Sequence, residues 1–386
     1  MPHLKTFARA ALALAAGLAL SVAAHADINV GVIVSLTGRG ASLGIPADNT
    51  IKRWPTEPAG QKVKLFVLND AIDTTNAAQN ATTLITDGQV EVIVGPSLTP
   101  TSLAVIEVAA RSGVPVISLA GGGAIVEPQD GPRRRAFKVA STETISTHAV
   151  PDPVPCNTAG TVATIGITTA CGEGFLKAIE RLAPAKGAKI VAIEKYAQAD
   201  TRATPQVLEL IAPNSDAVYA FSAGTPSALP HVERVKRDDM GQIDQTQGVA
   251  KADLLRIGGK ALEGSAMTVA PVRVADRFAD ANPVKAPGLD PVTRYEANDG
   301  AGARTLFGAT AWAAQLWQNG AIPVALKKGK PGTEGFRLAQ RDAIEGPNEF
   351  VGAQGVFKPG DKGHNGVGAR SQVMAKVEGA QWRLVT

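Results

Sequence analysis

From residue 27 onward, short runs rich in β-branched residues alternate with stretches whose apolar residues recur at helical spacing. Short apolar runs bounded by turn residues are typical of buried strands, whereas the longer spacing predicts helices. The predicted strands are Asp27–Leu36, Val63–Leu68, Val90–Val94, Val114–Leu119, Ala159–Ile167, Lys189–Glu194, Ala217–Phe221 and Ile243–Gln245. The predicted helices are Thr74–Asp87, Thr101–Arg111, Gly174–Leu182, Pro205–Ile211, Pro226–Lys236 and Gly300–Gln318. This alternation indicates right-handed βαβ crossovers and parallel sheets, so the predicted fold class is α/β.

One stretch, Ser141–Ala159, breaks the alternation where a crossover helix is due. It carries Pro151, Pro153 and Pro155, and a proline in a helix interior costs about 3 kcal/mol. We expect an irregular connector there, with one short helical turn before Pro151, at the point where a first α/β unit ends and a second begins.

Composition narrows the class of protein. The 386 residues suffice for two ordinary domains. Charged residues make up 19% of the chain and the net charge is +4, which argues against charge-driven disorder and a nucleic-acid-binding surface. With 4% aromatic residues, base stacking is also disfavoured. Two cysteines cannot form a disulfide scaffold or a four-thiolate zinc site.

The N-terminal segment predicts export. Lys5 and Arg9 precede the apolar run Ala10–Leu20, and Ala24-His25-Ala26 supplies small residues for cleavage. Because this run is shorter than the roughly 20 residues that span a bilayer, we interpret residues 1–26 as a cleaved signal peptide of a periplasmic protein. Its removal takes two positive charges away, so the net charge falls from +4 to +2.

The turn after Val90–Val94 is a candidate anion site, because ligands of open α/β sheets bind beyond the carboxyl ends of the strands. Thr99 is expected to cap a helix whose first residue is Pro100. That start would leave the backbone N–H groups of Thr101 and Ser102 free to bind an anion at the positive end of the helix.

Two further turns resemble it in position. The turn Ala120-Gly121-Gly122-Gly123 admits an anion close to the backbone, and Phe221-Ser222-Ala223-Gly224-Thr225-Pro226 repeats the Thr-Pro helix start. Such caps and glycine turns are also common where nothing binds. A carboxylate is favoured over a phosphate, because the chain has no P-loop sequence and Gly172-Glu173-Gly174 lacks the rest of a dinucleotide fingerprint.

Residues for catalysis or metal binding are sparse. His148, His231 and His364 are far apart in sequence and lack metal-ligand spacing, and there is no Gly-x-Ser-x-Gly elbow. Asp70 and Asp73 could form an acid pair, although capping of the helix near Thr74 is the more economical role. No enzyme activity, metal or cofactor is implied.

A series of motifs is more specific than any of its members. Together it resembles the solute-binding proteins of branched-chain amino acid ABC transporters, of the leucine/isoleucine/valine-binding type. The motifs are Val32-Ile33-Val34-Ser35-Leu36-Thr37-Gly38, Ala41-Ser42-Leu43-Gly44, Val92-Ile93-Val94-Gly95-Pro96, Pro115-Val116-Ile117-Ser118, Gly172-Glu173-Gly174, Gln247-Gly248-Val249-Ala250, Gly355-Val356-Phe357 and Lys376-Val377-Glu378-Gly379.

The resemblance implies a type I periplasmic binding fold, with two Rossmann-like lobes joined by three crossovers and closing on a ligand. It places residues 27–140 and 274–348 in an N-terminal lobe, and residues 141–273 and 349–386 in a C-terminal lobe. The implied partners are a small carboxylated solute and the permease subunits of the inner membrane, with a monomeric protein and no nucleic acid. The candidate ligand-binding residues are Ser42, Thr99, Thr101, Ala120, Gly121, Gly122, Cys171, Ser222, Gly224, Thr225 and Gln247.

Two of these positions depart from the family pattern. Relatives are expected to carry a tyrosine at Cys171 and, at Gln247, an acid that holds the ligand's ammonium group. An ammonium without that acid would be a buried unpaired charge, which costs about 3–5 kcal/mol, or about a hundredfold to a few thousandfold in affinity. We therefore predict a preference for a carboxylate without an amino group, such as an aliphatic or aromatic acid. An acid rotating in from elsewhere, or acceptance of the ammonium by the Gln247 carbonyl, is the alternative.

The two cysteines of an exported chain invite a disulfide between Cys156 and Cys171. The strand Ala159–Ile167 separates them, however, and a bridge needs Cα atoms within about 7 Å. Free thiols are therefore expected. Two other functions stay open: a ligand sensor that presents its closed form to a membrane receptor, and an α/β enzyme that uses the cleft.

Overall fold

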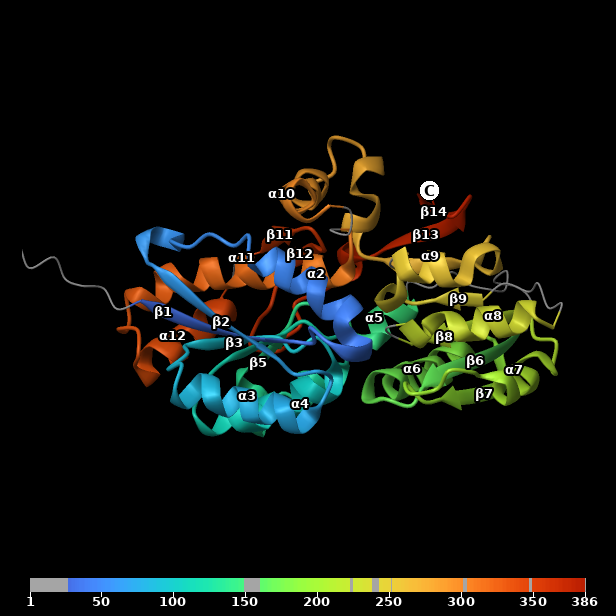
Figure 1. Cartoon of the computed structure of the whole chain (residues 1–386), viewed down its shortest axis with the longest axis horizontal. Helices are drawn as coiled ribbons and strands as arrows, with labels where there is room; N and C mark the ends of the chain where they lie inside the picture. The colour runs from blue at the N-terminus through green and yellow to red at the C-terminus, as the bar shows by residue number, and fades with distance from the viewer. Residues whose placement is uncertain are drawn as a thin grey trace, which may run out of the picture.

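The computed structural model describes residues 27–148, 160–222, 225–237, 243–250, 252–300, 304–346 and 349–385. Two largely parallel sheets lie side by side along the long axis of the molecule, each covered by helices (Figure 1). This arrangement confirms the predicted α/β class. We call the first sheet with its flanking helices the first lobe, and the second sheet with its own helices the second lobe.

The first sheet has the strand order β2-β1-β3-β4-β5, with every neighbouring pair parallel. Its strands are β1 (Ile28–Val34), β2 (Val63–Asn69), β3 (Val92–Val94), β4 (Val116–Ser118) and β5 (Ala136–Lys138). Its helices are α2 (Ala41–Ile51), α3 (Thr74–Thr86), α4 (Thr99–Arg111), α11 (Leu306–Leu326) and α12 (Glu334–Ile344).

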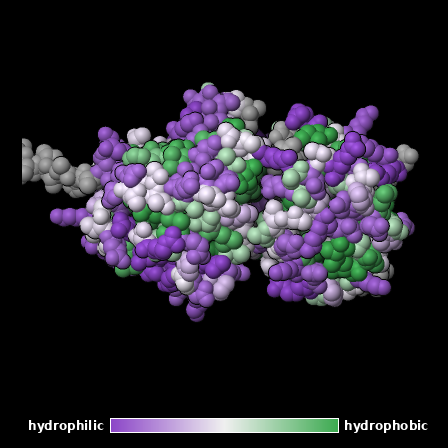
Figure 2. Space-filling view, turned by 60° about the horizontal axis from the view of Figure 1, so that its bottom comes forward, coloured by the Kyte–Doolittle hydropathy of each residue, from purple (hydrophilic) through white to green (hydrophobic). Residues whose placement is uncertain are grey.

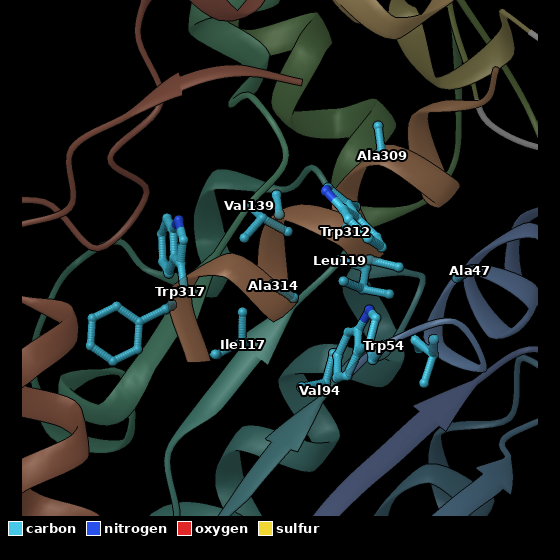
Figure 3. Packing of buried hydrophobic residues seen from close by; sticks show 14 of the residues in the cluster. Ala47, Trp54, Val94, Ile117, Leu119, Val139, Ala309, Trp312, Ala314 and Trp317 are labelled. Atoms are coloured by element: carbon cyan, nitrogen blue, oxygen red, sulfur yellow. The ribbon is translucent and has the colours of Figure 1, made fainter. Parts of the chain in front are cut away.

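Both faces of this sheet are covered, which explains why its strands are apolar at consecutive positions. Val32 and its even-numbered neighbours in β1 face a core that includes α2 and α11, whereas Ile33 faces a second core formed with α3 and α4. In the first core, Trp312 and Trp317 of α11 pack against β3, β4 and the residues that follow them (Figure 3).

The second sheet has the order β14-β13-β10-β9-β8-β6-β7. Its strands are β6 (Thr161–Ile167), β7 (Lys189–Tyr196), β8 (Ala217–Phe221), β9 (Ile243–Gln245), β10 (Ala266–Val269), β13 (Val373–Glu378) and β14 (Gln381–Leu384). The pairs of β13 with β10 and β14 are antiparallel, and the other pairs are parallel. The helices of this lobe are α6 (Ala170–Ala185), α7 (Thr204–Ile211), α8 (Leu229–Val235) and α9 (Ala252–Gly258).

The chain passes between the lobes after β5, after β10 and after the hairpin of β11 (Phe350–Gly352) and β12 (Gly355–Phe357). Helix α5 (Glu143–His148) lies between the sheets, and α10 (Lys285–Asp299) sits on the side of the first lobe (Figure 1). The remaining helical turns are η1 (Gly38–Gly40), η2 (Pro58–Gly60), η3 (Gly123–Ile125), η4 (Gly131–Arg135), η5 (Thr225–Ala228), η6 (Gln247–Val249), η7 (Gly259–Leu262), η8 (Pro271–Arg277) and η9 (Ala369–Ser371).

The β11–β12 hairpin packs on the first lobe. The Trp317 ring lies 6.1 Å from the Phe357 ring and 6.2 Å from the Phe350 ring, measured between centroids. Phe357 belongs to the first core, and Phe350 packs against it. The lobe boundaries drawn from the sequence stay a prediction, and this hairpin follows residue 349, where that prediction begins the second lobe.

The predicted elements correspond closely to these bounds. The short turn expected before Pro151 is α5, while residues 149–159, which include the three prolines and Cys156, lie outside the described residues, as do residues 1–26. Helix α11 begins and ends later than Gly300–Gln318, and its N-cap Thr305 accepts a hydrogen bond from the Gly308 N–H. The segment Pro226–Lys236 is a short η5 turn followed by α8, instead of one helix.

Candidate functional site

A cavity lies between the lobes, at the carboxyl ends of the strands. Figure 2 shows the molecule narrowing at this junction. The first lobe supplies Ser97, Leu98, Thr99, Pro100, Ala120 and Gly121, together with Leu306 and Phe307 at the start of α11. The segment after β5 supplies Ser141, and the second lobe supplies Ile167, Thr169, Cys171, Phe175, Gln198, Ser222, Thr246, Gln247 and Gly248. The turns after β3, β4, β6, β7, β8 and β9 therefore meet at one place, where ligands of open α/β sheets bind.

None of these lining residues is charged at neutral pH. Leu98, Ile167 and Phe307 contribute apolar side chains, and hydroxyl, amide and backbone groups supply the polarity. Such a cavity can hold an anion only through neutral hydrogen-bond donors, and its lining offers no carboxylate to a cation.

Helix α4 begins at Thr99, one residue before Pro100, which the sequence pattern predicted to be the first helical residue. Leu98 has extended backbone angles and is the N-cap, so Thr99 is the first helical residue and caps nothing with its side chain. The Ser102 N–H donates to the Leu98 carbonyl at 2.9 Å and is therefore not free. Thr101 is fully buried, its hydroxyl donates to the same carbonyl at 3.1 Å, and it does not line the cavity. The prediction was thus wrong in giving the Ser102 N–H to an anion, whereas the role of the Thr101 N–H stays a prediction.

Thr99 instead faces the glycine turn after β4. Its Oγ1 accepts a hydrogen bond from the Gly122 N–H at 3.1 Å. A Cβ on Gly122 would lie 2.5 Å from the Thr99 Oγ1 atom, so only glycine permits this approach. The Ala120 N–H donates to the Ser118 hydroxyl at 3.1 Å, which leaves Gly121 as the backbone of the turn that borders the cavity.

Among the buried oxygen atoms of the cavity wall that have no hydrogen-bond partner in the described residues are Ser97 Oγ, Thr246 Oγ1 and Gln247 Oε1. Their side chains are 1%, 1% and 5% exposed. Buried polar atoms in native proteins are nearly always paired, so three orphans in one cavity mark it as a place for a bound molecule or water.

Cys171 lies in the first turn of α6 and carries a free thiol. Burial, together with the nearby Glu143 carboxylate, raises the pKa of this thiol to about 12, although Lys138 and a hydrogen bond with Thr99 oppose the shift. The residue is therefore a neutral part of the wall and not a nucleophile. Pairing with Cys156 stays a prediction, because Cys156 lies outside the described residues.

The structure thus brings together six of the predicted site residues, which are Thr99, Ala120, Gly121, Cys171, Ser222 and Gln247. Gly122 does not line the cavity itself but contacts Thr99, which does. Ser42 in α2 and Thr101 are not among the residues that line the cavity. Thr225 begins η5 and Gly224 lies outside the described residues. Sequence reasoning missed Ser97, Ser141, Phe175, Gln198, Thr246, Leu306 and Phe307. A strand-end position was a usable signal for Ser97, Gln198 and Thr246, but Leu306 and Phe307 reach the cavity only through tertiary folding.

The other candidates have structural roles. Asp73 caps α3 by accepting from the Asn76 N–H at 2.8 Å, and Asp70 accepts from the Ser35 hydroxyl at 2.6 Å. His231 and His364 are both buried, and burial lowers the pKa of His231 to about 3. Among the described residues, no group of histidine, cysteine and acidic side chains could hold a metal ion. Nor does any helix in the described part of the chain have the length and hydrophobicity to cross a membrane.

Comparisons with known proteins agree with this architecture. Residues 27–351 match the family model described as periplasmic binding protein. An extracellular ligand-binding receptor from Rhodopseudomonas palustris HaA2 is 36% identical, with a TM-score of 0.89 over 94% of this chain and all of that one. Among curated protein sequences, none matches this chain significantly.

More distant structures share the fold. A leucine-binding protein from Thermotoga maritima MSB8 is 18% identical, with a TM-score of 0.77 over 93% of this chain and 98% of that one. A solute-binding protein of an ABC transporter from R. palustris, in complex with benzoate, is 17% identical, with a TM-score of 0.78 over 93% and 96% of the two chains. Given a match over most of its length, this chain belongs to the periplasmic binding proteins, in the family of the leucine/isoleucine/valine-binding type.

Proposed function

We propose that this chain is the extracytoplasmic solute-binding component of an ABC importer, and that its ligand is a small carboxylate without an amino group. The observation that carries the ligand class is the absence of charge from the lining of the interlobe cavity, among the residues the structure describes. Export through the signal peptide at residues 1–26 and delivery to a membrane permease belong to the same proposal.

The cavity disfavours an amino acid. The α-ammonium of leucine would enter a site whose polar lining residues in the second lobe, Thr246 and Gln247 among them, are neutral. A buried ammonium that has lost its carboxylate partner costs about 3–5 kcal/mol, and this corresponds to about a hundredfold to a few thousandfold in affinity.

The cavity suits a carboxylate. The Thr99 hydroxyl and the backbone at Gly121 border the first-lobe end, where a ligand oxygen can accept hydrogen bonds. Hydrogen bonds to a charged group contribute about 1.5–3 kcal/mol each, so a few of them hold a carboxylate without a cation in contact. The fold itself does not choose the ligand, since it is shared by a protein named for leucine and by one solved with benzoate.

Matched pairs of ligands test this proposal. Isothermal titration calorimetry should compare leucine with 4-methyl-2-oxopentanoate and with 4-methylpentanoate, and phenylalanine with 3-phenylpropanoate and benzoate. We expect at least one deaminated acid to bind at least about a hundredfold more tightly than its amino acid. Tighter binding of leucine or phenylalanine would overturn the ligand class, and conversion of the bound acid into product would overturn the assignment as a binding protein.

A further inference from the structure

We propose that Lys138 sets the preference of the cavity for an anion without touching the ligand, by acting through the Gly121–Gly122 peptide on the Thr99 hydroxyl. This inference rests on the proposed function, because it assigns a positioning residue to the same carboxylate site.

Lys138 is an unusual residue for its position. It is the last residue of β5, an edge strand of the first sheet, and its side chain is nevertheless fully buried. Its Nζ atom donates to the Gly121 carbonyl at 2.8 Å, but Lys138 is not among the residues that line the cavity. A buried ammonium is costly, and lysine is rarely fully buried unless it is paired.

The hydrogen bonds continue from Lys138 to the cavity. The carbonyl that accepts from Lys138 and the N–H that donates to Thr99 Oγ1 at 3.1 Å belong to the same peptide group, between Gly121 and Gly122. Thr99 Oγ1 accepts this bond and also forms a hydrogen bond with Cys171. Because the neutral thiol can donate its own proton to Thr99 Oγ1, the Thr99 proton can turn to an acceptor at the cavity. Hydrogen bonds in such a chain polarise one another, so a charge at one end strengthens the donor at the other.

The groups that face Lys138 come from three neighbouring segments. They are Glu143 at the start of α5, Cys171 in α6 and Glu127 between η3 and η4. Glu143 is held in place by the Gly123 N–H at 2.7 Å, and a Cβ on Gly174 would lie 2.5 Å from its other oxygen. The competing explanation is that Lys138 and Glu143 only stabilise the junction of the lobes as a structural pair. The experiment must separate that structural role from an electrostatic effect of Lys138 on the ligand.

Pairs of ligands that differ only in charge distinguish the structural role of Lys138 from the electrostatic one. Calorimetry should compare benzoate with benzamide, and 4-methylpentanoate with 4-methylpentanamide, on the wild type and on Lys138→Met, with Lys138→Arg as the variant that keeps the charge. Lys189→Met, at the exposed first residue of β7, removes the same charge from the surface. A structural pair affects the carboxylate and its amide alike, whereas an electrostatic role affects only the carboxylate.

We expect Lys138→Met to weaken carboxylate binding about tenfold and to change amide binding less than about twofold, the size expected for one charge acting across a peptide group. Lys138→Arg should restore part of the preference, and Lys189→Met should behave as the wild type. Equal losses for carboxylate and amide would overturn the role of Lys138. Failure of the wild type to bind any carboxylate would instead overturn the proposed function. If Lys138→Met does not fold, the wild type at about pH 7 and about pH 9.5 supplies the same comparison.

Discussion

The Nζ atom of Lys138 lies 2.8 Å from the carbonyl oxygen of Gly121, and the next N–H along the chain, that of Gly122, donates to Thr99 in the cavity wall. A lysine so deeply buried loses its proton at a lower pH than an exposed lysine does. Burial lowers the pKa of Lys138 to about 8, although Glu143, Cys171 and Glu127 favour its charged form. Its charge is therefore sensitive to pH in a range that binding experiments reach.

We expect carboxylate affinity to be lost as the pH rises through this pKa. A bound carboxylate favours the protonated lysine, so binding raises the pKa of Lys138 above its value of about 8 in the free protein. Affinity should thus be constant below about pH 8 and should fall by up to tenfold per pH unit above it, until the pKa of the complex is reached. Calorimetry with benzoate from about pH 6.5 to about pH 10 measures this, and benzamide affinity should stay flat. A decline shared by benzamide would contradict the assignment.

Gln247 provides a second test, because glutamate has nearly the same shape. Gln247 is 5% exposed and its Oε1 atom has no hydrogen-bond partner in the part of the chain that the structure describes, so Gln247→Glu places a carboxylate where an ammonium would need one. We expect leucine affinity to rise and 4-methylpentanoate affinity to fall, each by about tenfold or more. The new glutamate charge attracts the ammonium of leucine, whereas it only repels the carboxylate of 4-methylpentanoate.

Gln247→Ala is the control for Gln247→Glu, since it removes the amide without adding a charge. Gln247→Ala should lower the affinity for both leucine and 4-methylpentanoate, or for neither. If Gln247→Glu leaves the preference between leucine and 4-methylpentanoate unchanged, Gln247 does not contact that end of the ligand.

Gly122 should be intolerant of a side chain. Its Cβ would lie 2.5 Å from Thr99 Oγ1 and 2.5 Å from Thr99 Cγ2, so Gly122→Ala must displace Thr99 or the turn. Overpacking of this kind typically costs about 1–3 kcal/mol in the free energy of unfolding, which urea denaturation measures. At Gly360 a Cβ would meet nothing within 4 Å, so Gly360→Ala is the matched control and should be close to neutral. Equal stability of the two variants would count against the Thr99–Gly122 contact.

The sequence predicted the parts of this fold that depend on local periodicity. Strands such as β3 and β8 are continuous apolar runs, because both faces of their sheets are covered, and such runs can be recognised without knowledge of the tertiary structure. Asp73 was also identified as a cap from its position alone, since an N-cap is a local interaction.

The parts that were missed depend on distant contacts. The three-residue strand β5 ends in the buried Lys138, and a lysine normally indicates a surface position. Thr99 was placed correctly at the cavity but with the wrong role, because proline at Pro100 is compatible with either the first or the second helical position. Leu306 and Phe307 meet the turn after β3 across about 200 residues of sequence, and no local pattern encodes that meeting.

The last prediction concerns a hydrogen bond that joins the lobes at the cavity. Arg39 in η1 of the first lobe donates from Nη1 to the Gln198 carbonyl of the second lobe at 2.7 Å, and Gln198 lines the cavity. Separation of the lobes here must break this bond. Because the contact is exposed, it should contribute only about 1 kcal/mol, so we expect Arg39→Ala to weaken carboxylate binding about fivefold, mostly through faster dissociation measured by stopped-flow fluorescence. Lys195→Ala removes an exposed ion pair with Glu173 that lies within the second lobe, and dissociation from that variant should be unchanged. If both variants release the ligand at the wild-type rate, the Arg39 contact does not hold the lobes together over the ligand.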